Sequence, residues 1–179
     1  SLLSLQAESV SSVDDAMVAF EESNKRIYSI ARVHENLYGT DNLSAVDMSS
    51  YIRELVHDLR TAHGRDDTVT IHLHVDEIDL GIEHAIPCGI ILNELLTNSY
   101  RHAFPDHRHG EITVSLTLLE PDHYRLTVAD NGVGLTAAEA EGLSGSLGMR
   151  LVRILTEQLS GDIQFSGERG AQFVVEWTG

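Results

Sequence analysis

Hydrophobic positions recur along this chain with two different spacings, and the change between them divides the sequence. From Asp14 to Tyr38 there is no proline or glycine, and one set of positions returns at alternating steps of three and four residues. This heptad-like spacing predicts a helix with one face suited to another helix. The positions are Met17, Phe20, Asn24, Ile27, Ala31, His34 and Tyr38.

A shorter helical pattern precedes this one. Leu2, Leu5 and Val10 share one helical face, and Ser12 follows at the position of a helix cap. Two helices that each carry such a face cannot bury it within one chain. We therefore expect residues 1–40 to form a helical hairpin, two copies of which build a dimeric four-helix bundle.

Beyond a linker at residues 41–50, helical and strand patterns alternate. We expect a hairpin around Pro121 and a last helix that Gly161 closes. The order of elements over residues 51–179 predicts an α+β fold, an α/β sandwich of helices on a mostly antiparallel or mixed sheet. Helices are expected at 51–60, from Glu83 to just before Pro105, and at 147–161, and strands at 68–75, 111–120, 124–130, 161–167 and 171–177.

Composition narrows the range of partners. The chain has 28 acidic and 12 basic residues, a net charge of −16, which argues against general nucleic-acid binding and against docking on an anionic membrane. No stretch reaches the roughly 18 uncharged apolar residues of a membrane span, and no signal peptide is visible. The single Cys88 excludes an internal disulfide and indicates a buried thiol in a reducing, cytoplasmic compartment. Because the chain starts at Ser1 without methionine, we expect it to be part of a longer protein, soluble or membrane-anchored.

The segment "ILNELLTNSYRHAF", residues 91–104, stands out by its polar positions. Four polar residues fall on one helical face: Glu94, Asn98, Arg101 and His102. An acid, an amide, a cation and an imidazole together can hold a metal ion and an anion. Asn98 offers a neutral oxygen of the kind that magnesium accepts, and Glu94 could accept a proton or orient a water molecule.

Two glycine-rich segments complete the set. In "DNGVG", Asp130 leaves a strand with an acceptor-only carboxylate that suits the amino group of adenine. Gly132 and Gly134 permit a tight backbone beside a flat ring. In "SGSLGMRLV", residues 144–152, free backbone N–H groups at a helix start favour phosphate. Each segment alone is typical of an ordinary turn, helix start or solvated helix. Binding of a nucleotide with its metal ion is indicated only by the occurrence of all three segments in this order along the chain.

These segments, as "NELLTNSYRHAF", "DNGVG" and "SLGMRLV", resemble the N box and the two glycine boxes of sensor histidine kinases. Those kinases belong to the ATPase superfamily (GHKL) shared with gyrase, Hsp90 and the mismatch-repair ATPases. "AIPCGIILNELLTNSYRHAFPD" is similar to the subfamily with an HRVKNNLQ-type phosphoacceptor helix. "SLLSLQ" resembles the end of that helix, and "RIYSIARVHENLY" resembles the second bundle helix. The resemblance covers essentially the whole chain and implies the α/β sandwich of the histidine kinase and Hsp90-like ATPases.

The resemblance implies a role for each matching residue. Asn98 would bind the Mg²⁺ that bridges the phosphates of ATP, Glu94 would be the catalytic base, and Asp130 would hold the adenine amino group. Residues 135–147 would form a lid over the nucleotide. The nucleotide-binding residues would be Asn98, Arg101, His102, Asp130, Gly132, Gly134, Ser146, Leu147, Gly148 and Met149.

The sequence departs from the family pattern at two points. Ser144 and Ser146 stand where many of these kinases carry glycine, which would stiffen the lid or change how it binds phosphate. The phosphoacceptor histidine would lie upstream of this chain, which would therefore bind ATP without phosphorylating itself at the usual site. His34 matches the second bundle helix and not the acceptor, and His72 and His74 have no Cys or acid at zinc-ligand spacing.

The implied function is that of a protein-histidine kinase in a two-component system. It would transfer the γ-phosphoryl group of ATP to a histidine and then to an aspartate of a response regulator, and it would act as a homodimer. One alternative is a serine kinase or ATP-driven clamp of the same superfamily, against which the helical seam argues. The others are a nucleotide-binding module without phosphoryl transfer and a purely structural dimer.

Overall fold

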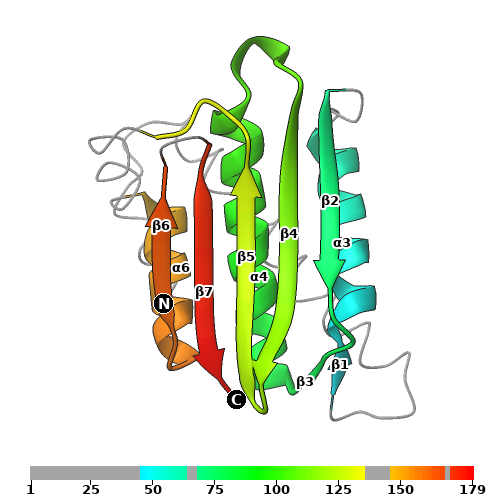
Figure 1. Ribbon diagram of the computed structural model, residues 1–179, viewed down its shortest axis with the longest axis vertical. Helices are drawn as coiled ribbons and strands as arrows, with labels where there is room; N and C mark the ends of the chain where they lie inside the picture. Colours follow the sequence, from blue (N-terminus) through cyan, green and yellow to red (C-terminus); the bar gives the residue numbers. More distant parts are fainter. Residues whose placement is uncertain (1–44, 64–67, 136–145, 168–169) are drawn as a thin grey trace, which may run out of the picture.

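The computed structural model of the protein describes residues 45–63, 68–135, 146–167 and 170–179 (Figure 1). The helical hairpin expected at residues 1–40 and most of the expected lid lie outside this part of the chain. The described elements form a five-stranded sheet, a layer of helices and a second sheet of two short strands.

The large sheet is mixed, as the sequence predicts. Its first two strands run parallel, with Val69 opposite Gly110, and every other neighbouring pair runs antiparallel. The hairpin expected around Pro121 is confirmed, because Glu120 pairs with His123 across it. In spatial order the strands are β2 (Val69–Val75), β4 (Gly110–Glu120), β5 (His123–Asp130), β7 (Gln172–Thr178) and β6 (Asp162–Ser166).

Three helices lie on one face of this sheet, which gives the predicted α/β sandwich of the α+β class (Figure 1). Burial follows the two-residue period of a strand. Ile112, Val114 and Leu116 of β4 are fully buried under the helices, and the residues between them are half-buried. None of the described helices is both long and apolar enough to cross a membrane. The three helices are α3 (Met48–His63), α4 (Ile82–Asn98) and α6 (Leu147–Gln158).

The central helix α4 is buried almost all round, which differs from the amphipathic helix that its polar positions suggest. Asn93 and Glu94 are only 3% and 8% exposed. The reason is that α4 lies between α3 and α6 as well as on the sheet (Figure 1), so Asn93 and Glu94 face neighbouring elements and not solvent. A buried polar side chain on this helix must find its partners inside the protein.

The C-terminal end of α4 changes geometry before the chain leaves the helix. Residues Ser99–Ala103 form a π-helical segment, η1, and Pro105–His107 form a 3-10 turn, η2. The predicted helix end before Pro105 is confirmed. Because π-helical bonds span five residues and not four, each residue of η1 turns through a smaller angle than in an α-helix. Side chains beyond Ser99 are therefore rotated relative to the α-helical face assumed from the sequence.

The last helix ends at Gln158, three residues before the predicted end at Gly161. Ser160, with φ of 55°, takes the left-handed position that the sequence assigned to Gly161. Ser160 N donates to Glu157 O at 2.9 Å and Gly161 N donates to Thr156 O at 2.9 Å, the bond pair of a Schellman motif. Gly161 is needed for a different reason, since a Cβ there would overlap the carbonyl oxygen of Glu176.

Two short strands, β1 (Val46–Asp47) and β3 (Asp79–Leu80), pair antiparallel and were not predicted. β1 and the start of α3 fall within the range 41–50 that was expected as a linker. Asp47 caps α3, because its Oδ1 accepts from Ser49 N at 2.9 Å and from Ser50 N at 3.2 Å. The Ser50 hydroxyl also donates to this carboxylate and lowers the pKa of Asp47 below its usual value.

Candidate functional site

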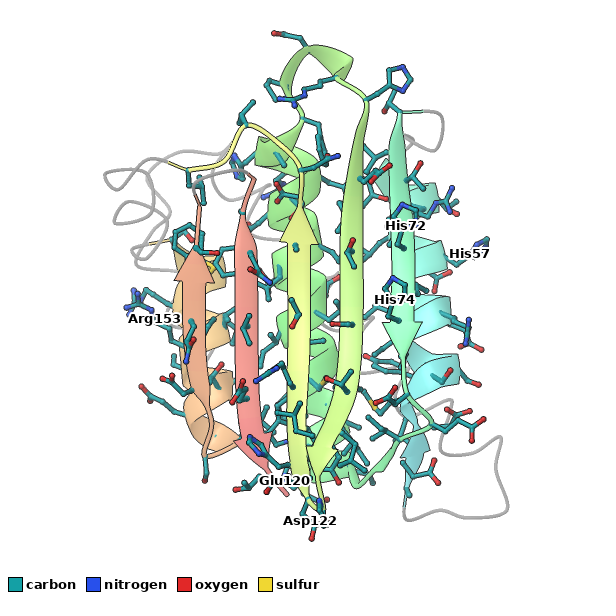
Figure 2. The ribbon with its side chains drawn as sticks, in the orientation of Figure 1. His57, His72, His74, Glu120, Asp122 and Arg153 are labelled. Carbon is teal, nitrogen blue, oxygen red and sulfur yellow. The ribbon has the colours of Figure 1, made fainter. Side chains whose placement is uncertain are left out.

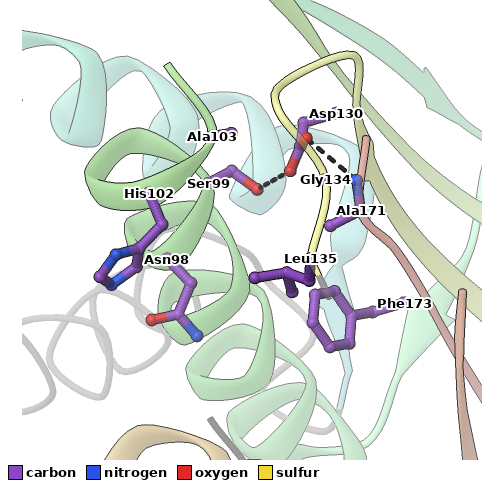
Figure 3. A pocket seen from close by; sticks show the side chains of 9 residues that line it. All are labelled: Asn98, Ser99, His102, Ala103, Asp130, Gly134, Leu135, Ala171 and Phe173. Carbon is purple, nitrogen blue, oxygen red and sulfur yellow. Dashed lines mark hydrogen bonds between the residues drawn. The ribbon is translucent and has the colours of Figure 1, made fainter. Parts of the chain in front are cut away.

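Asp130 is the last residue of β5 and is buried, with 8% of its surface exposed. Its carboxylate accepts three hydrogen bonds within the protein. The backbone N–H groups of Gly132 and Ala171 donate to Oδ1 at 3.0 and 3.1 Å, and Ser99 Oγ is 3.0 Å from Oδ2. The bonds to Ser99 and Ala171 are drawn in Figure 3. The carboxylate is therefore held in one direction by three separate segments.

The loop after Asp130 fits closely against the end of η1. Val133 N donates to the carbonyl oxygen of Ala103 at 3.0 Å, and a Cβ at Gly132 would overlap that same oxygen. Gly134 has φ of 73°, in the left-handed region that glycine adopts freely. Both glycines of this loop are thus required. Gly132 allows the loop to approach the carbonyl oxygen of Ala103, and Gly134 allows the left-handed backbone.

A third glycine supports the same aspartate and was missed by the sequence analysis. Gly170 has φ of 86°, and a Cβ at this position would overlap the carbonyl oxygen of Asp130. The next residue completes the contact, since Asp130 N donates to Ala171 O at 2.8 Å. Only the pairing of β5 with β7, which the sequence does not specify, identifies this position.

Asp130 lines an open cleft between the end of α4 and the sheet (Figure 3). Its lining is polar on the helix side and mostly apolar on the side of β7 and of the loop after β5. Four of the predicted nucleotide-binding residues line it: Asn98, His102, Asp130 and Gly134. The lining residues that the sequence analysis missed are Ser99, Ala103, Leu135, Ala171 and Phe173.

Other predicted residues meet at the start of α6. Ser146 Oγ accepts from Met149 N at 3.3 Å and caps the helix. Asn98 Nδ2 donates to the sulfur of Met149 at 3.5 Å. A Cβ at Gly148 would lie 2.7 Å from Oε2 of Glu94. The acid predicted as the base therefore lies against the second glycine box, outside the set of residues that line the cleft.

Arg101 and His102 are both exposed, and of these two only His102 lines the cleft. Within the N box, Asn98 and His102 line the cleft, whereas Glu94 lies against Gly148 of α6. Because Asn98 contacts Met149, Glu94 and Asn98 both face the start of α6.

The strand histidines lie away from this cleft. His72 and His74 are exposed on the sheet face opposite the helices (Figure 2), and His72 Nε2 is 3.8 Å from Glu111 Oε2. Within the described residues, no group of three or more His, Cys, Asp or Glu side chains is placed to hold a metal ion.

These features define a class of protein: a mixed sheet under one layer of helices, with a cleft between the central helix and a strand that ends in a buried aspartate. Residues 83–178, more than half of the 179 residues, match the family described as "Histidine kinase-, DNA gyrase B-, and HSP90-like ATPase". The chain belongs to this family. Residues 1–63 match a second family, described as "Histidine kinase". The resemblance to sensor histidine kinases is thereby confirmed.

Two curated proteins and one solved structure are similar to the chain over most of its length. Blue-light-activated histidine kinase 2 of Erythrobacter litoralis is 26% identical over 160 residues, which are 89% of this chain and 45% of that protein. Sensor histidine kinase PdtaS of Mycobacterium tuberculosis is 28% identical over 186 residues, covering 97% of this chain and 35% of PdtaS. The chain thus spans less than half the length of these two relatives.

The solved structure is the histidine kinase domain of a blue-light activated histidine kinase from Erythrobacter litoralis. Its TM-score with this chain is 0.78 at 19% identity, and the match covers 99% of this chain and 90% of that one. At this level of identity the likeness concerns the fold.

Proposed function

We propose that the chain is the ATP-binding catalytic region of a sensor histidine kinase, with most of its dimerisation hairpin attached. The observation that carries the proposal is the buried carboxylate of Asp130 in a cleft that also contains the amide of Asn98. Family membership supplies the reaction class, and the arrangement of these two side chains suits the two ends of a nucleotide.

The deep end of the cleft suits a purine base. Three of the roughly four acceptor sites on the Asp130 carboxylate are used within the protein, which leaves one on Oδ2 for the amino group of adenine. Leu135 and Phe173 line the same cleft with apolar surface that a flat ring can contact.

The other end suits phosphate and magnesium. Because Nδ2 of Asn98 is bonded to Met149, its Oδ1 remains as a hard oxygen ligand for Mg²⁺. His102 would contact phosphate from the cleft wall and Arg101 from the exposed side of η1. The N-terminus of α6, including Gly148, offers backbone N–H groups and the positive end of the helix dipole. Bound Mg²⁺ would neutralise charge on the phosphates, and we keep Glu94 as the candidate base.

The reaction proposed is phosphoryl transfer to a histidine on an upstream helix. A nitrogen of that histidine forms a bond to the γ-phosphorus as the bond to the β–γ bridging oxygen breaks, and ADP leaves. The phosphoryl group then passes to an aspartate of a response regulator receiver domain. The protein contributes mainly positioning and charge neutralisation. The match of residues 1–63 to a histidine kinase family supports a homodimer formed through the N-terminal hairpin.

The first test is nucleotide binding to the chain itself. Calorimetric titration with ATP and Mg²⁺ should show binding, and Asn98→Ala should lower the Mg²⁺-dependent affinity at least about tenfold. Asn131→Ala is the matched control, because Asn131 is an exposed amide beside the site whose Oδ1 accepts from Glu111 N. If the chain binds no ATP, or binds equally well in Asn98→Ala, the assignment of this cleft is wrong.

The second test separates the histidine kinase from its relatives. A protein extended upstream to include the phosphoacceptor helix is incubated with γ-labelled ATP and Mg²⁺. Label that is acid-labile and alkali-stable, and absent in Asn98→Ala, is the expected result. Acid-stable label would indicate a serine kinase. No label despite ATP binding would indicate a nucleotide-binding module and would overturn the proposed reaction.

A further inference from the structure

Ser99 is the residue whose side chain joins η1 to the Asp130 carboxylate. It is the first residue of η1, is 5% exposed, and its Oγ lies 3.0 Å from Oδ2 of Asp130. Ser99 also lines the cleft next to Asn98, so two consecutive residues contribute to its wall (Figure 3). Ser99 lies within the N box, but its residue type alone does not mark it as part of the site. Its backbone is still α-helical, with its N–H bonded to Leu95 O, and its side chain points toward the carboxylate at the end of β5.

The direction of this hydrogen bond follows from the bonding capacity of both groups. An ionised carboxylate has no hydrogen, and a serine hydroxyl has one, so Ser99 donates and Asp130 accepts. Oδ1 of Asp130 is already engaged by the backbone N–H groups of Gly132 and Ala171. Two groups at this wall of the cleft therefore still have acceptor sites for a ligand. They are Oδ2 of Asp130, with one site, and Oγ of Ser99, and both residues line the cleft.

We infer that Ser99 is a positioning residue that makes the cleft selective for a 6-amino purine over a 6-oxo purine. Its hydroxyl fixes the direction of Oδ2 and places a second acceptor beside it, so that an exocyclic amino group meets acceptors only. A carbonyl oxygen in the same place would face the two acceptors, Asp130 Oδ2 and Ser99 Oγ, and would find no donor. Polar sites discriminate most strongly against analogues whose polar groups are left unpaired in this way. This inference rests on the proposed nucleotide binding.

The test compares ATP with inosine triphosphate, in which a carbonyl replaces the amino group, by calorimetry on the full chain. The wild type should bind ATP more tightly than inosine triphosphate. Ser99→Ala should lower the affinity for ATP about tenfold and leave that for inosine triphosphate nearly unchanged, because the second ligand gains nothing from the fixed Oδ2. The ratio of the two affinities should therefore fall about tenfold. Ser99→Thr, which keeps the hydroxyl, should restore the ratio.

The matched control is a variant that removes a buried hydroxyl from another part of the protein, away from the cleft. Thr156 is 2% exposed and its Oγ1 donates to Val152 O at 2.9 Å within α6. Thr156→Val should destabilise the protein without changing the ratio of the two affinities, and circular dichroism should show Ser99→Ala folded. An unchanged ratio in Ser99→Ala, or a ratio not restored in Ser99→Thr, would overturn the role of Ser99 while ATP binding stands. Failure of the wild type to bind either nucleotide would overturn the proposed function as well.

Discussion

The side-chain amide of Asn98 and the thioether of Met149 meet between α4 and α6, with 3.5 Å between Nδ2 and Sδ. An amide has a donor end and an acceptor end, so this contact orients both: the nitrogen faces the sulfur and Oδ1 is turned away from it. A thioether is a weak acceptor, yet it suffices to select one of two amide orientations. This contact is one link between the N box and the second glycine box, beside the approach of Glu94 to Gly148.

Met149→Leu should weaken Mg²⁺-dependent ATP binding while leaving the fold intact. Leucine fills a similar volume and costs less than about 1.5 kcal/mol of unfolding free energy, but it cannot accept from Asn98. Loss of one weak hydrogen bond, about 1 kcal/mol, corresponds to a roughly fivefold lower affinity. Titration of ATP in Mg²⁺ and in EDTA measures the effect, which should be confined to the Mg²⁺ titration. Equal losses in both titrations would contradict the orienting role.

Gly132→Ala should damage the fold and the cleft together. A Cβ at residue 132 would overlap backbone and side-chain atoms of Ala103, and neither can move without shifting η1. We expect a loss of about 2 kcal/mol in the free energy of unfolding, as for overpacked sites, together with loss of ATP binding. Urea unfolding and calorimetry measure the two effects. A variant of wild-type stability would show that the loop and η1 yield easily.

Gly148→Ala is the comparison for this variant. Its new Cβ would lie 2.7 Å from the end of the Glu94 side chain, which can turn aside, and alanine favours the helix by up to about 1 kcal/mol. We therefore expect stability equal to or above that of the wild type. Any loss of phosphoryl transfer in an upstream-extended Gly148→Ala protein would then report on the site, through the displaced Glu94 carboxylate or the phosphate contact at Gly148, and not on folding.

Much of the fold could be predicted because the deciding signals are local. The strand that ends at Asp130 has the two-residue period of a half-buried strand. Pro105 marks the end of the helical segment that starts with α4. The strands β1 and β3 were missed because two residues each are too few for a period to be visible. The enclosure of α4 was missed because periodicity describes one helix and not the neighbours on either side of it.

The candidate site was predicted as far as its chemistry is carried by single residues. Asn98 is marked by the polar residues on its helical face, and Asp130 by the glycines that follow it. Ser99 and Gly170 were missed because their roles depend on where Asp130 lies in the fold. Ser99 bonds to a carboxylate 31 positions away, and Gly170 precedes Ala171, which bonds to Asp130 across 41 positions. Nothing in the sequence indicates that η1 departs from α-helical geometry.

Ser160→Gly should stabilise the protein. Ser160 ends α6 with φ of 55°, a conformation that costs a residue with a Cβ about 1 kcal/mol and costs glycine almost nothing. The expected gain in unfolding free energy is therefore about 1 kcal/mol, measured by urea denaturation. Gly161→Ala is the opposite case, because its Cβ would overlap Glu176 O and should lower stability. Equal effects of the two substitutions would contradict the assignment of the left-handed position to Ser160.

The buried thiol of Cys88 should make the protein less stable in alkali. Burial raises the pKa of Cys88 from 9.0 to about 12. Between these values the unfolded chain releases the thiol proton and the folded protein keeps it, so stability falls as pH rises by about 1.4 kcal/mol per unit. Below about pH 9 the thiol is protonated in both states and contributes no pH dependence.

Comparison with Cys88→Ala isolates this contribution, because other alkaline groups titrate in both proteins. Tyr51, whose pKa is raised mainly by burial and further by the charge on Cys88, acts in the same direction above its ordinary value of 10.0. Urea unfolding at about pH 8 and about pH 10 should show the stability difference between wild type and Cys88→Ala shrinking by roughly 1 kcal/mol. Parallel pH profiles would mean that the thiol ionises without unfolding, and hence that the core around α4 opens locally.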